Sequence, residues 1–417
     1  MSTVPPPATP PIRLLIASAY APAALFETGL GAITPVIPLL AVQLGGGLGQ
    51  GALVVALLGI GLILGDVPAG ALAARVGDRR AMLIAALVAA VALTGCALAP
   101  SLALLALGVL VVGAVSAVFH LARQSFLTEV IPVRQRARAL STLGGVSRIG
   151  AFLGPFLGAG LLHLAPLRSV FWLAAGLSLL AGLVVAVAPE VDREGARGRP
   201  AGSGPGAWTL LRRHGRMFAT LGLAVVLVGA VRATRQVVLP LWSEHLGLAP
   251  ATTSLVFGLS GAVDVLLFYP GGRLMDRRGR LWVAVPSMLI LGGSIALLPL
   301  TGSVGTLAIA AMVMGFGNGI SSGVLMTLGA DVAPPEARAT FLGVWRVFQD
   351  SGTAAGPLVV SAVGALAGLA AGITTMGVAG LVGAAALARW VPRWSEHANA
   401  RTRAEAARRR LAGPDPG

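Results

Sequence analysis

Long apolar stretches, separated by short polar or charged segments, are the main pattern along the chain. Each stretch holds about 20 residues, enough for an α-helix to cross the roughly 30 Å hydrocarbon core of a bilayer. The pattern predicts twelve such helices, and the sequence is therefore expected to form an all-α membrane protein. The expected spans are 14–40, 52–73, 82–99, 103–124, 141–163, 168–188, 218–242, 252–272, 282–300, 305–328, 340–363 and 370–391.

The composition agrees with this pattern. The chain has 417 residues, of which 56% are hydrophobic and 11% charged, whereas a soluble domain carries about a quarter charged residues. The lone cysteine, Cys96, can form neither an intrachain disulfide nor a cysteine metal site. The sequence holds no nucleophile elbow, phosphate-binding loop or metal-binding motif. We therefore expect no enzyme and no cofactor.

The net charge of +15 is concentrated in alternate connections between the expected spans. One set of connections is rich in arginine, while the other set, with "QLGGGLGQG" and "LAPSLA", is almost free of it. The positive-inside rule then places both termini in the cytoplasm. The basic charge is thus explained by membrane topology, and no nucleic-acid partner is expected. Because all basic residues are arginine, with abundant Ala and Gly, we expect a bacterial cytoplasmic membrane protein.

A segment rich in Pro, Gly and Arg, "PEVDREGARGRPAGSGPGAWTLLRRHGR", separates the sixth and seventh spans. We interpret it as a cytoplasmic linker between two six-span halves. The expected parts are an N-terminal half (1–188), the linker (189–217), a C-terminal half (218–391) and a basic cytoplasmic tail (392–417).

The two halves share residues at one constant offset of 202 positions, without a gap. A constant offset across five separate segments predicts two parallel six-helix repeats, an arrangement that transporters use to rock around a central site. The matched pairs are Pro38/Pro240, Pro68/Pro270, Gly70/Gly272, Arg75/Arg277, Gly77/Gly279, Pro132/Pro334, Arg136/Arg338, Gly150/Gly352, Gly154/Gly356 and Pro155/Pro357.

Two motifs carry a resemblance to a known family. "GGRLMDRRGR" after the eighth span resembles the loop signature of the major facilitator superfamily, and "GALAARVGDRR" after the second span is its copy, with Ala74 in place of the signature Asp. "GAFLGPFLGAG" in the fifth span resembles the Gly-x-x-x-Gly-Pro-x-x-Gly pattern of that superfamily's proton-coupled drug exporters. The resemblance implies a major facilitator fold of twelve spans.

These motifs define the residues expected to gate the transporter. Glycine allows backbone with positive φ in tight turns, and proline inside a helix kinks it. The competing interpretation is that the arginines only fix topology and the glycines only pack helices. The candidate gating residues are Gly70, Arg75, Gly77, Arg148, Gly150, Gly154, Pro155, Gly272, Asp276, Arg277, Gly279 and Arg280.

Ionisable residues inside apolar spans are costly and mark functional sites. The candidates for proton coupling are Glu27, Asp264 and Asp350, and those for the substrate cavity are Glu27, Arg232, Arg235 and Arg346. We expect Glu27 to provide the counter-charge for Arg232 and Arg235. His120 is expected to be a packing residue, although histidine titrates near neutral pH.

Two alternatives remain open for Asp350 in the eleventh span. It can bridge to Arg148, its repeat mate, or pair locally with Arg346 one helical turn away. The sequence also departs from the exporter pattern in the fourth span, "LGVLVVGAVSAV". Val109 stands there in place of the arginine that many exporters carry. Another group would have to perform the role of that arginine.

The resemblance implies a proton-coupled secondary transporter that exports small amphipathic molecules or drugs by alternating access. Its expected partners are a small-molecule substrate, protons and the lipid bilayer, and we expect a monomer. The alternative is a proton-coupled importer of an anionic nutrient or metabolite, which the paired arginines and the missing fourth-span arginine favour. A receptor or scaffold without transport would not need charges inside the spans.

Overall fold

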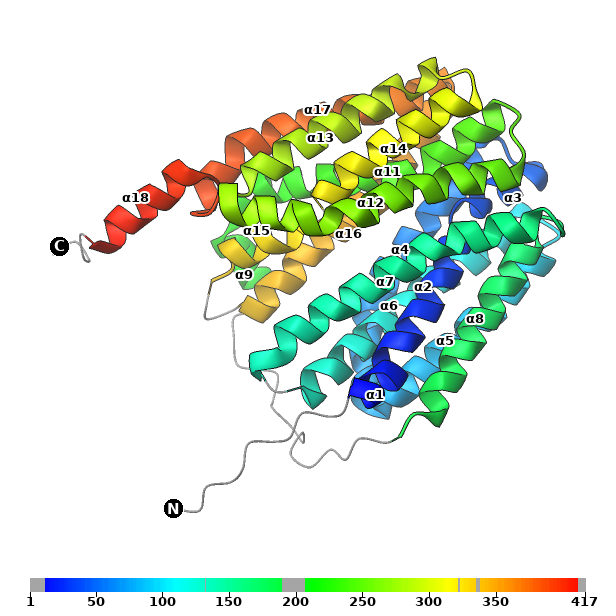
Figure 1. The fold of residues 1–417 in the computed structure, drawn as a ribbon, viewed down its shortest axis with the longest axis horizontal. Helices are drawn as coiled ribbons and strands as arrows, with labels where there is room; N and C mark the ends of the chain where they lie inside the picture. Colours follow the sequence, from blue (N-terminus) through cyan, green and yellow to red (C-terminus); the bar gives the residue numbers. More distant parts are fainter. Residues whose placement is uncertain (1–11, 132, 190–206, 322, 335–337, 412–417) are drawn as a thin grey trace. The chain divides into compact units, whose positions relative to one another are not determined.

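The computed structural model describes residues 12–131, 133–189, 207–321, 323–334 and 338–411, which form helices joined by short turns (Figure 1). The chain divides into two compact units: unit 1 holds Met1–Gly45 and Leu57–Gly202, and unit 2 holds Gly46–Ala56 and Ser203–Gly417. Most of the expected linker lies outside the described residues.

Unit 1 contains the helices expected for the first six spans. In chain order they are α1 (Ile12–Leu15), the π-helical turn η1 (Ile16–Tyr20), α2 (Ala21–Ile33), α3 (Val36–Gln43), α4 (Leu48–Val76, whose first residues belong to unit 2), α5 (Asp78–Leu98), α6 (Leu102–Val130), α7 (Val133–Leu162) and α8 (Ser169–Val187). Within this unit α2 packs on α7 and α8, and α5 packs on α6 and α8.

Unit 2 contains the remaining spans and a C-terminal helix. In chain order the helices are α9 (Ala207–Arg213), α10 (Gly215–Met217), the π-helical turn η2 (Phe218–Gly222), α11 (Leu223–His245), α12 (Pro250–Arg278), α13 (Leu281–Leu297), the 3₁₀ turn η3 (Leu298–Leu300), α14 (Val304–Ile320), α15 (Val324–Val332), α16 (Arg338–Ala367), α17 (Leu369–Trp394) and α18 (Ala400–Leu411). Here α11 packs on α16, and α13 packs on α17 and α14.

The prediction of an all-α membrane protein is confirmed. Among the described residues, 11 helices are long and apolar enough to cross a membrane. The expected eleventh span, α16, is long enough but more polar, because it carries Arg346 and Asp350. The expected tenth span is divided into α14 and α15, with a break between Ile320 and Val324.

The repeat is visible in the local backbone of the two units. The π-helical turns η1 and η2 stand at equivalent positions, 202 residues apart. The same offset relates two pairs of positive-φ glycines, Gly45 with Gly247 and Gly77 with Gly279. Positive φ is a conformation that residues with a Cβ atom rarely adopt. The glycines are therefore required at these turns.

Matched glycines also set the closest helix crossings. A Cβ atom at Gly154 would overlap the carbonyl oxygen of Thr28, and one at Gly356 would overlap that of Ala230. The glycines and the carbonyls they approach are both related by 202 positions. Small residues let helix backbones approach closely in membranes, so the α2–α7 and α11–α16 crossings use the same contact in both units.

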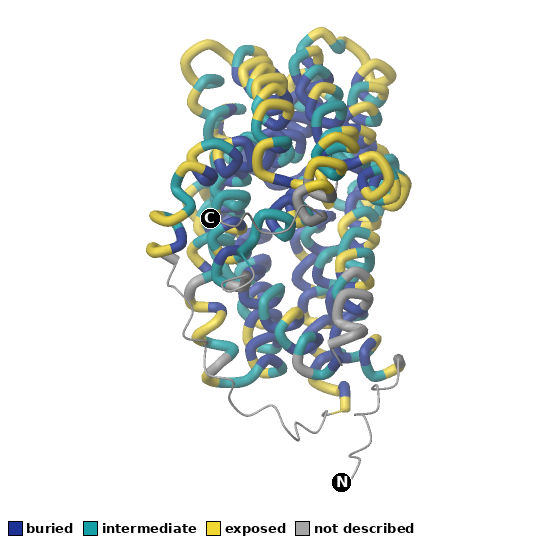
Figure 2. Tube along the Cα trace, turned by 90° about the vertical axis from the view of Figure 1, so that its left-hand side faces the viewer, coloured by how far each residue is buried: buried dark blue, intermediate teal, exposed yellow. Residues whose placement is uncertain are grey.

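The helices have buried faces and exposed faces (Figure 2), and the exposed faces carry large apolar side chains. Large apolar side chains such as Leu64, Leu87 and Val91 are exposed, while Phe26, Phe119 and Phe171 are fully buried. Because lipid tails are as apolar as leucine, exposed apolar faces are stable in a bilayer.

The crossing of α2 and α7 gives a test of this packing. We expect Gly154→Ala to lower the stability of the purified protein by about 1–3 kcal/mol, because the added methyl group must push the two backbones apart. Gly160→Ala in the same helix is the control, since nothing lies within 4 Å of a Cβ atom there. Thermal unfolding in detergent measures both, and equal midpoints would contradict the packing described.

Candidate functional site

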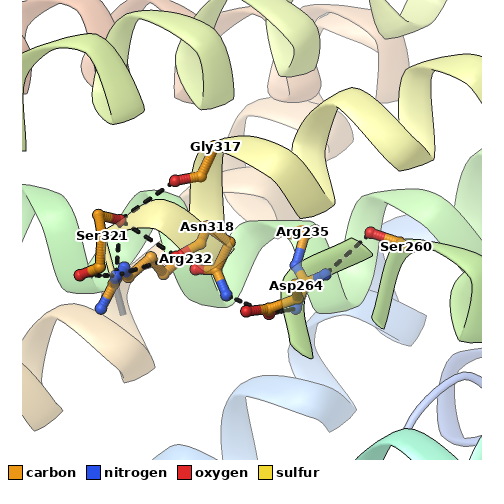
Figure 3. Close-up of polar contacts among 7 residues, drawn as sticks. All are labelled: Arg232, Arg235, Ser260, Asp264, Gly317, Asn318 and Ser321. Atoms are coloured by element: carbon orange, nitrogen blue, oxygen red, sulfur yellow. Dashed lines mark hydrogen bonds and ion pairs between the residues drawn. The ribbon is translucent and has the colours of Figure 1, made fainter. Parts of the chain in front are cut away.

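A polar network in unit 2 joins α11, α12 and α14 inside the expected membrane region (Figure 3). Arg235 on α11 donates hydrogen bonds to Ser260 at 2.8 Å and to Asp264 at 3.2 Å, both on α12. The side-chain amide of Asn318 on α14 donates to the same oxygen of Asp264. The Arg235 and Asp264 side chains are only 11% and 17% exposed. Each charge is therefore neutralised inside the unit.

The second arginine of α11, Arg232, lies at the break between α14 and α15. Its guanidinium donates to the carbonyl oxygen of Ser321 at 2.7 Å and to the hydroxyl oxygen of Ser321 at 2.8 Å. The last carbonyls of a helix lack partners within that helix and carry partial negative charge. Arg232 therefore satisfies carbonyls that the break exposes, which is how irregular backbone is stabilised at membrane depth.

A second ionic cluster lies in unit 1, between α2 and α6. Arg123 on α6 donates to Oε1 of Glu27 on α2 at 2.9 Å. Nε2 of His120 lies 2.9 Å from the same oxygen. The Glu27 and Arg123 side chains are 14% and 8% exposed. The guanidinium of Arg123 and the imidazole of His120 thus both lie against one carboxylate oxygen of Glu27.

Residue spacing explains how these clusters form. Arg232 and Arg235 are three residues apart on α11, as are His120 and Arg123 on α6, so each pair shares a helix face. Gly150 of α7 packs against Glu27, where an added Cβ atom would lie 3.1 Å from the Glu27 Cβ. The small residue lets α7 approach the acid closely, so little room is left for its side chain to turn toward α7.

The structure gives Glu27 and Arg235 partners other than each other, and the expected pairing of Glu27 with Arg232 stays a prediction. Arg123 is the arginine partner of Glu27, and Asp264 is the carboxylate partner of Arg235. Each pair lies within one unit. Arg123 lies on the same helix as Val109, 14 residues later.

For Asp350 the structure shows the local alternative. Nε of Arg346 lies 3.5 Å from Oδ2 of Asp350, one turn along α16. The Arg346 side chain is 44% exposed, and exposed pairs of this kind contribute little stability. The bridge from Arg148 to Asp350 stays a prediction.

The expected gating residues other than Arg148 fall into four groups. Gly77 and Gly279 have positive φ, and Gly150 and Gly154 lie at the α2–α7 crossing, which Pro155 follows within a continuous α7. A Cβ atom would have open space at Gly272 and would make only an ordinary contact with Leu121 at Gly70, so no close approach demands glycine at either position. Among the loop arginines, Arg280 makes two hydrogen bonds to Asp331, at 2.9 and 3.1 Å. Arg75 and Arg277 lie exposed at helix ends, as does Asp276.

Several residues of the two clusters were missed or underrated from the sequence. Asn318 and Ser321 lie in "GFGNGISSG", a glycine- and polar-rich stretch inside an apolar run, which signals a broken helix. His120 was expected only to pack. Its spacing of three residues from Arg123 was the available signal for a shared site.

The comparisons with known proteins agree with this fold of long apolar helices. The sequence profile of the Major Facilitator Superfamily matches residues 23–357 and, in a second match, residues 221–413. The chain belongs to the major facilitator superfamily.

Curated relatives include transporters from several bacteria. The chain is 26% identical to the multidrug resistance protein MdtH of Photorhabdus laumondii, over 77% of this chain and 80% of that protein. It is 26% identical to MdtH of an Enterobacter species, over 56% and 57%. It is 28% identical to an uncharacterized MFS-type transporter of Mycobacterium tuberculosis, over 39% of this chain. The chain spans only 23% of that last protein's length.

Solved structures share the fold at low sequence identity. A bacterial homologue of the human lysosomal transporter Spinster, in an inward-facing and unoccupied conformation, aligns with a TM-score of 0.74 and 16% identity, covering 92% of this chain and 97% of that one. A POT family transporter in complex with 5-aminolevulinic acid aligns with a TM-score of 0.73 and 12% identity, covering 92% and 96%. Together with the family match, these likenesses show a multi-pass membrane protein with the major facilitator fold.

The buried pair in unit 2 gives a second prediction. Asp264→Ala leaves the Arg235 charge buried without its counter-charge, and removing one partner of a buried pair costs about 3–5 kcal/mol. We expect a large fall in the thermal midpoint of Asp264→Ala, partly restored by the double variant Asp264→Ala/Arg235→Leu. Glu405→Ala, which removes the acid of an exposed pair with Arg401, is the control and is expected to leave the midpoint unchanged. A double variant less stable than Asp264→Ala would contradict the pairing.

Proposed function

We propose that the chain is a proton-coupled secondary transporter that exports small amphipathic molecules by alternating access, with Glu27 as the proton-carrying group. The observation that carries the proposal is the contact of Glu27 with both Arg123 and His120 inside unit 1. An acid in the membrane that is paired within one half is the kind of group through which proton binding can change packing.

The chemistry of the cluster explains how a proton could drive movement. Arginine keeps its charge at every relevant pH, so a proton on Glu27 leaves Arg123 without its counter-charge. An unpaired charge in a low-dielectric site is costly, so Arg123 must find another acceptor or move toward water. His120 stands beside the same carboxylate oxygen, and an imidazole is a group that can accept a proton and pass it on.

The side chain of Asp264 is held by more hydrogen bonds than that of Glu27. Its carboxylate accepts from Arg235 and Asn318, while Arg235 is also bonded to Ser260. Fixed partners on two other helices, α11 and α14, favour a role as a permanent counter-charge. We therefore place Asp264, and likewise Asp350, second to Glu27 as candidates for the proton.

The pairing of the α11 arginines supports export over import. An importer of anions would use Arg232 and Arg235 to hold its substrate, but Asp264 neutralises Arg235. The Gly-Pro motif of α7 and the relatives named as multidrug resistance proteins support export of amphipathic compounds. We further propose a monomer in a bacterial cytoplasmic membrane with both termini in the cytoplasm.

Proton movement in liposomes tests the proposal. Purified protein is reconstituted with a pH-sensitive dye in an acidic lumen, and ethidium, an amphipathic cation, is added outside. We expect protons to leave the lumen as ethidium enters, and Glu27→Gln to reduce the signal to that of empty liposomes. Glu405→Gln makes the same chemical change on exposed α18 and should behave as wild type.

Each other outcome has a definite meaning. Wild-type exchange rates in Glu27→Gln would overturn Glu27 as the proton carrier. Entry of protons together with an organic anion such as salicylate would overturn export and favour the importer. A full signal in Glu27→Gln and a lost one in Asp264→Asn would move the proton site to unit 2.

A further inference from the structure

The C-terminal segment is attached to the signature loop of unit 2. We define the signature loop as Asp276–Leu281, which runs from the last turn of α12 to the first residue of α13. We define the C-terminal strap as Ser395–Asn399, between α17 and α18. The amides of Arg280 and Leu281 donate to the carbonyl oxygens of His397 and Ala398, at 3.2 and 3.0 Å. These amides stand at the start of α13, where a helix leaves its own N–H groups without partners. The strap therefore caps α13.

The other side of the loop is capped from the same segment. Arg403 on α18 donates to the carbonyl oxygens of Asp276 and Arg277, both at 3.0 Å. These carbonyls belong to the last turn of α12, the negative end of its dipole, where a cation is favourable. One short stretch of chain thus supplies acceptors to α13 and donors to α12.

Side chains reinforce this attachment. The hydroxyl of Ser395 donates to Oδ2 of Asp331 at 2.9 Å, the same oxygen that accepts from Nε of Arg280 at 2.9 Å. The Arg280 and Asp331 side chains are only 11% and 10% exposed, and Ser395 and Ala398 are buried. The loop arginine, the α15 acid and the strap therefore form one buried polar cluster.

Gly279 shows that the loop is shaped for this strap. Its φ of +106° already favours glycine. In addition, a Cβ atom at Gly279 would overlap the carbonyl oxygen of Ala398. The signature glycine is thus required by the strap as well as by the turn.

We propose that Ser395, the strap carbonyls and Arg403 are positioning residues for the signature loop, and that the loop of unit 2 gates transport only while the C-terminal segment holds it. The segment is then a working part of the gate rather than a solvated tail. The α18 helix begins with its own cap, in which Thr402 N donates to Oδ1 of Asn399 at 2.9 Å, so Arg403 is presented to α12 from a fixed helix turn.

Two arginines of α18 provide a matched test in the full-length protein. Arg403 bonds the loop, whereas Arg401, two residues earlier, pairs with Glu405 and is 86% exposed. Hydrogen exchange of the purified protein, followed by mass spectrometry of peptides covering the loop, compares Arg403→Gln with Arg401→Gln. We expect Arg403→Gln to speed exchange of the loop amides by about tenfold, as the loss of a charge-assisted hydrogen bond implies. Arg401→Gln should match wild type.

A transport readout separates a gating role from a merely structural one. In the liposome assay described above, Arg403→Gln is expected to lower the maximal rate severalfold at unchanged KM, with an unchanged thermal midpoint in detergent. Ser395→Ala is the second variant and should show the same effects more weakly. Unchanged loop exchange in both variants would overturn the attachment, and faster exchange with an unchanged maximal rate would overturn the gating role. The exchange experiment needs no substrate, so its result does not depend on the proposed function.

Discussion

A charge inside the hydrocarbon region needs a partner within reach, and this constraint decides where the helices of both units must meet. Glu27 and Arg123 join α2 to α6, and Asp264 and Arg235 join α12 to α11. Because the attraction within a buried ion pair offsets little more than the cost of removing both charges from water, such pairs add little to stability. Their presence in both units is better explained by a function that needs charge inside the membrane.

Close helix crossings place these charges. Gly150 lets α7 pack against the backbone beside Glu27, and Gly154 brings the same two helices together one turn later. Unit 2 repeats the crossing through Gly352 and Gly356. The crossings are equivalent while the charges are not, since the residue equivalent to Glu27 in the repeat is Gly229. The repeat thus provides a common scaffold on which each unit carries its own polar cluster.

The fold followed from the sequence because apolar length, arginine placement and matched glycines are local signals that lipid enforces everywhere along the chain. The pairing of charges did not follow. Depth along a span placed Glu27, Arg232 and Arg235 correctly inside the apolar region, but partner choice depends on helix rotation, which hydropathy does not report. The division of the tenth span was missed for a related reason. "GFGNGISSG" lies inside a longer apolar run, so hydropathy averaged over the span predicts one continuous helix. The contact of Arg232 with Ser321 shows what satisfies the backbone where the helix stops. The docking of the strap depends on backbone carbonyls, which every residue carries.

Proton release on substrate binding tests the proposed coupling most directly, because it needs no membrane gradient and no assumption about the direction of transport. Purified protein in weakly buffered detergent solution, at a pH where the transporter is partly protonated, is mixed with ethidium while a pH indicator is followed. If a cationic substrate and a proton compete for Glu27, binding releases protons in the wild type and none in Glu27→Gln. Binding of ethidium to the wild type without any proton release would contradict the coupling we propose.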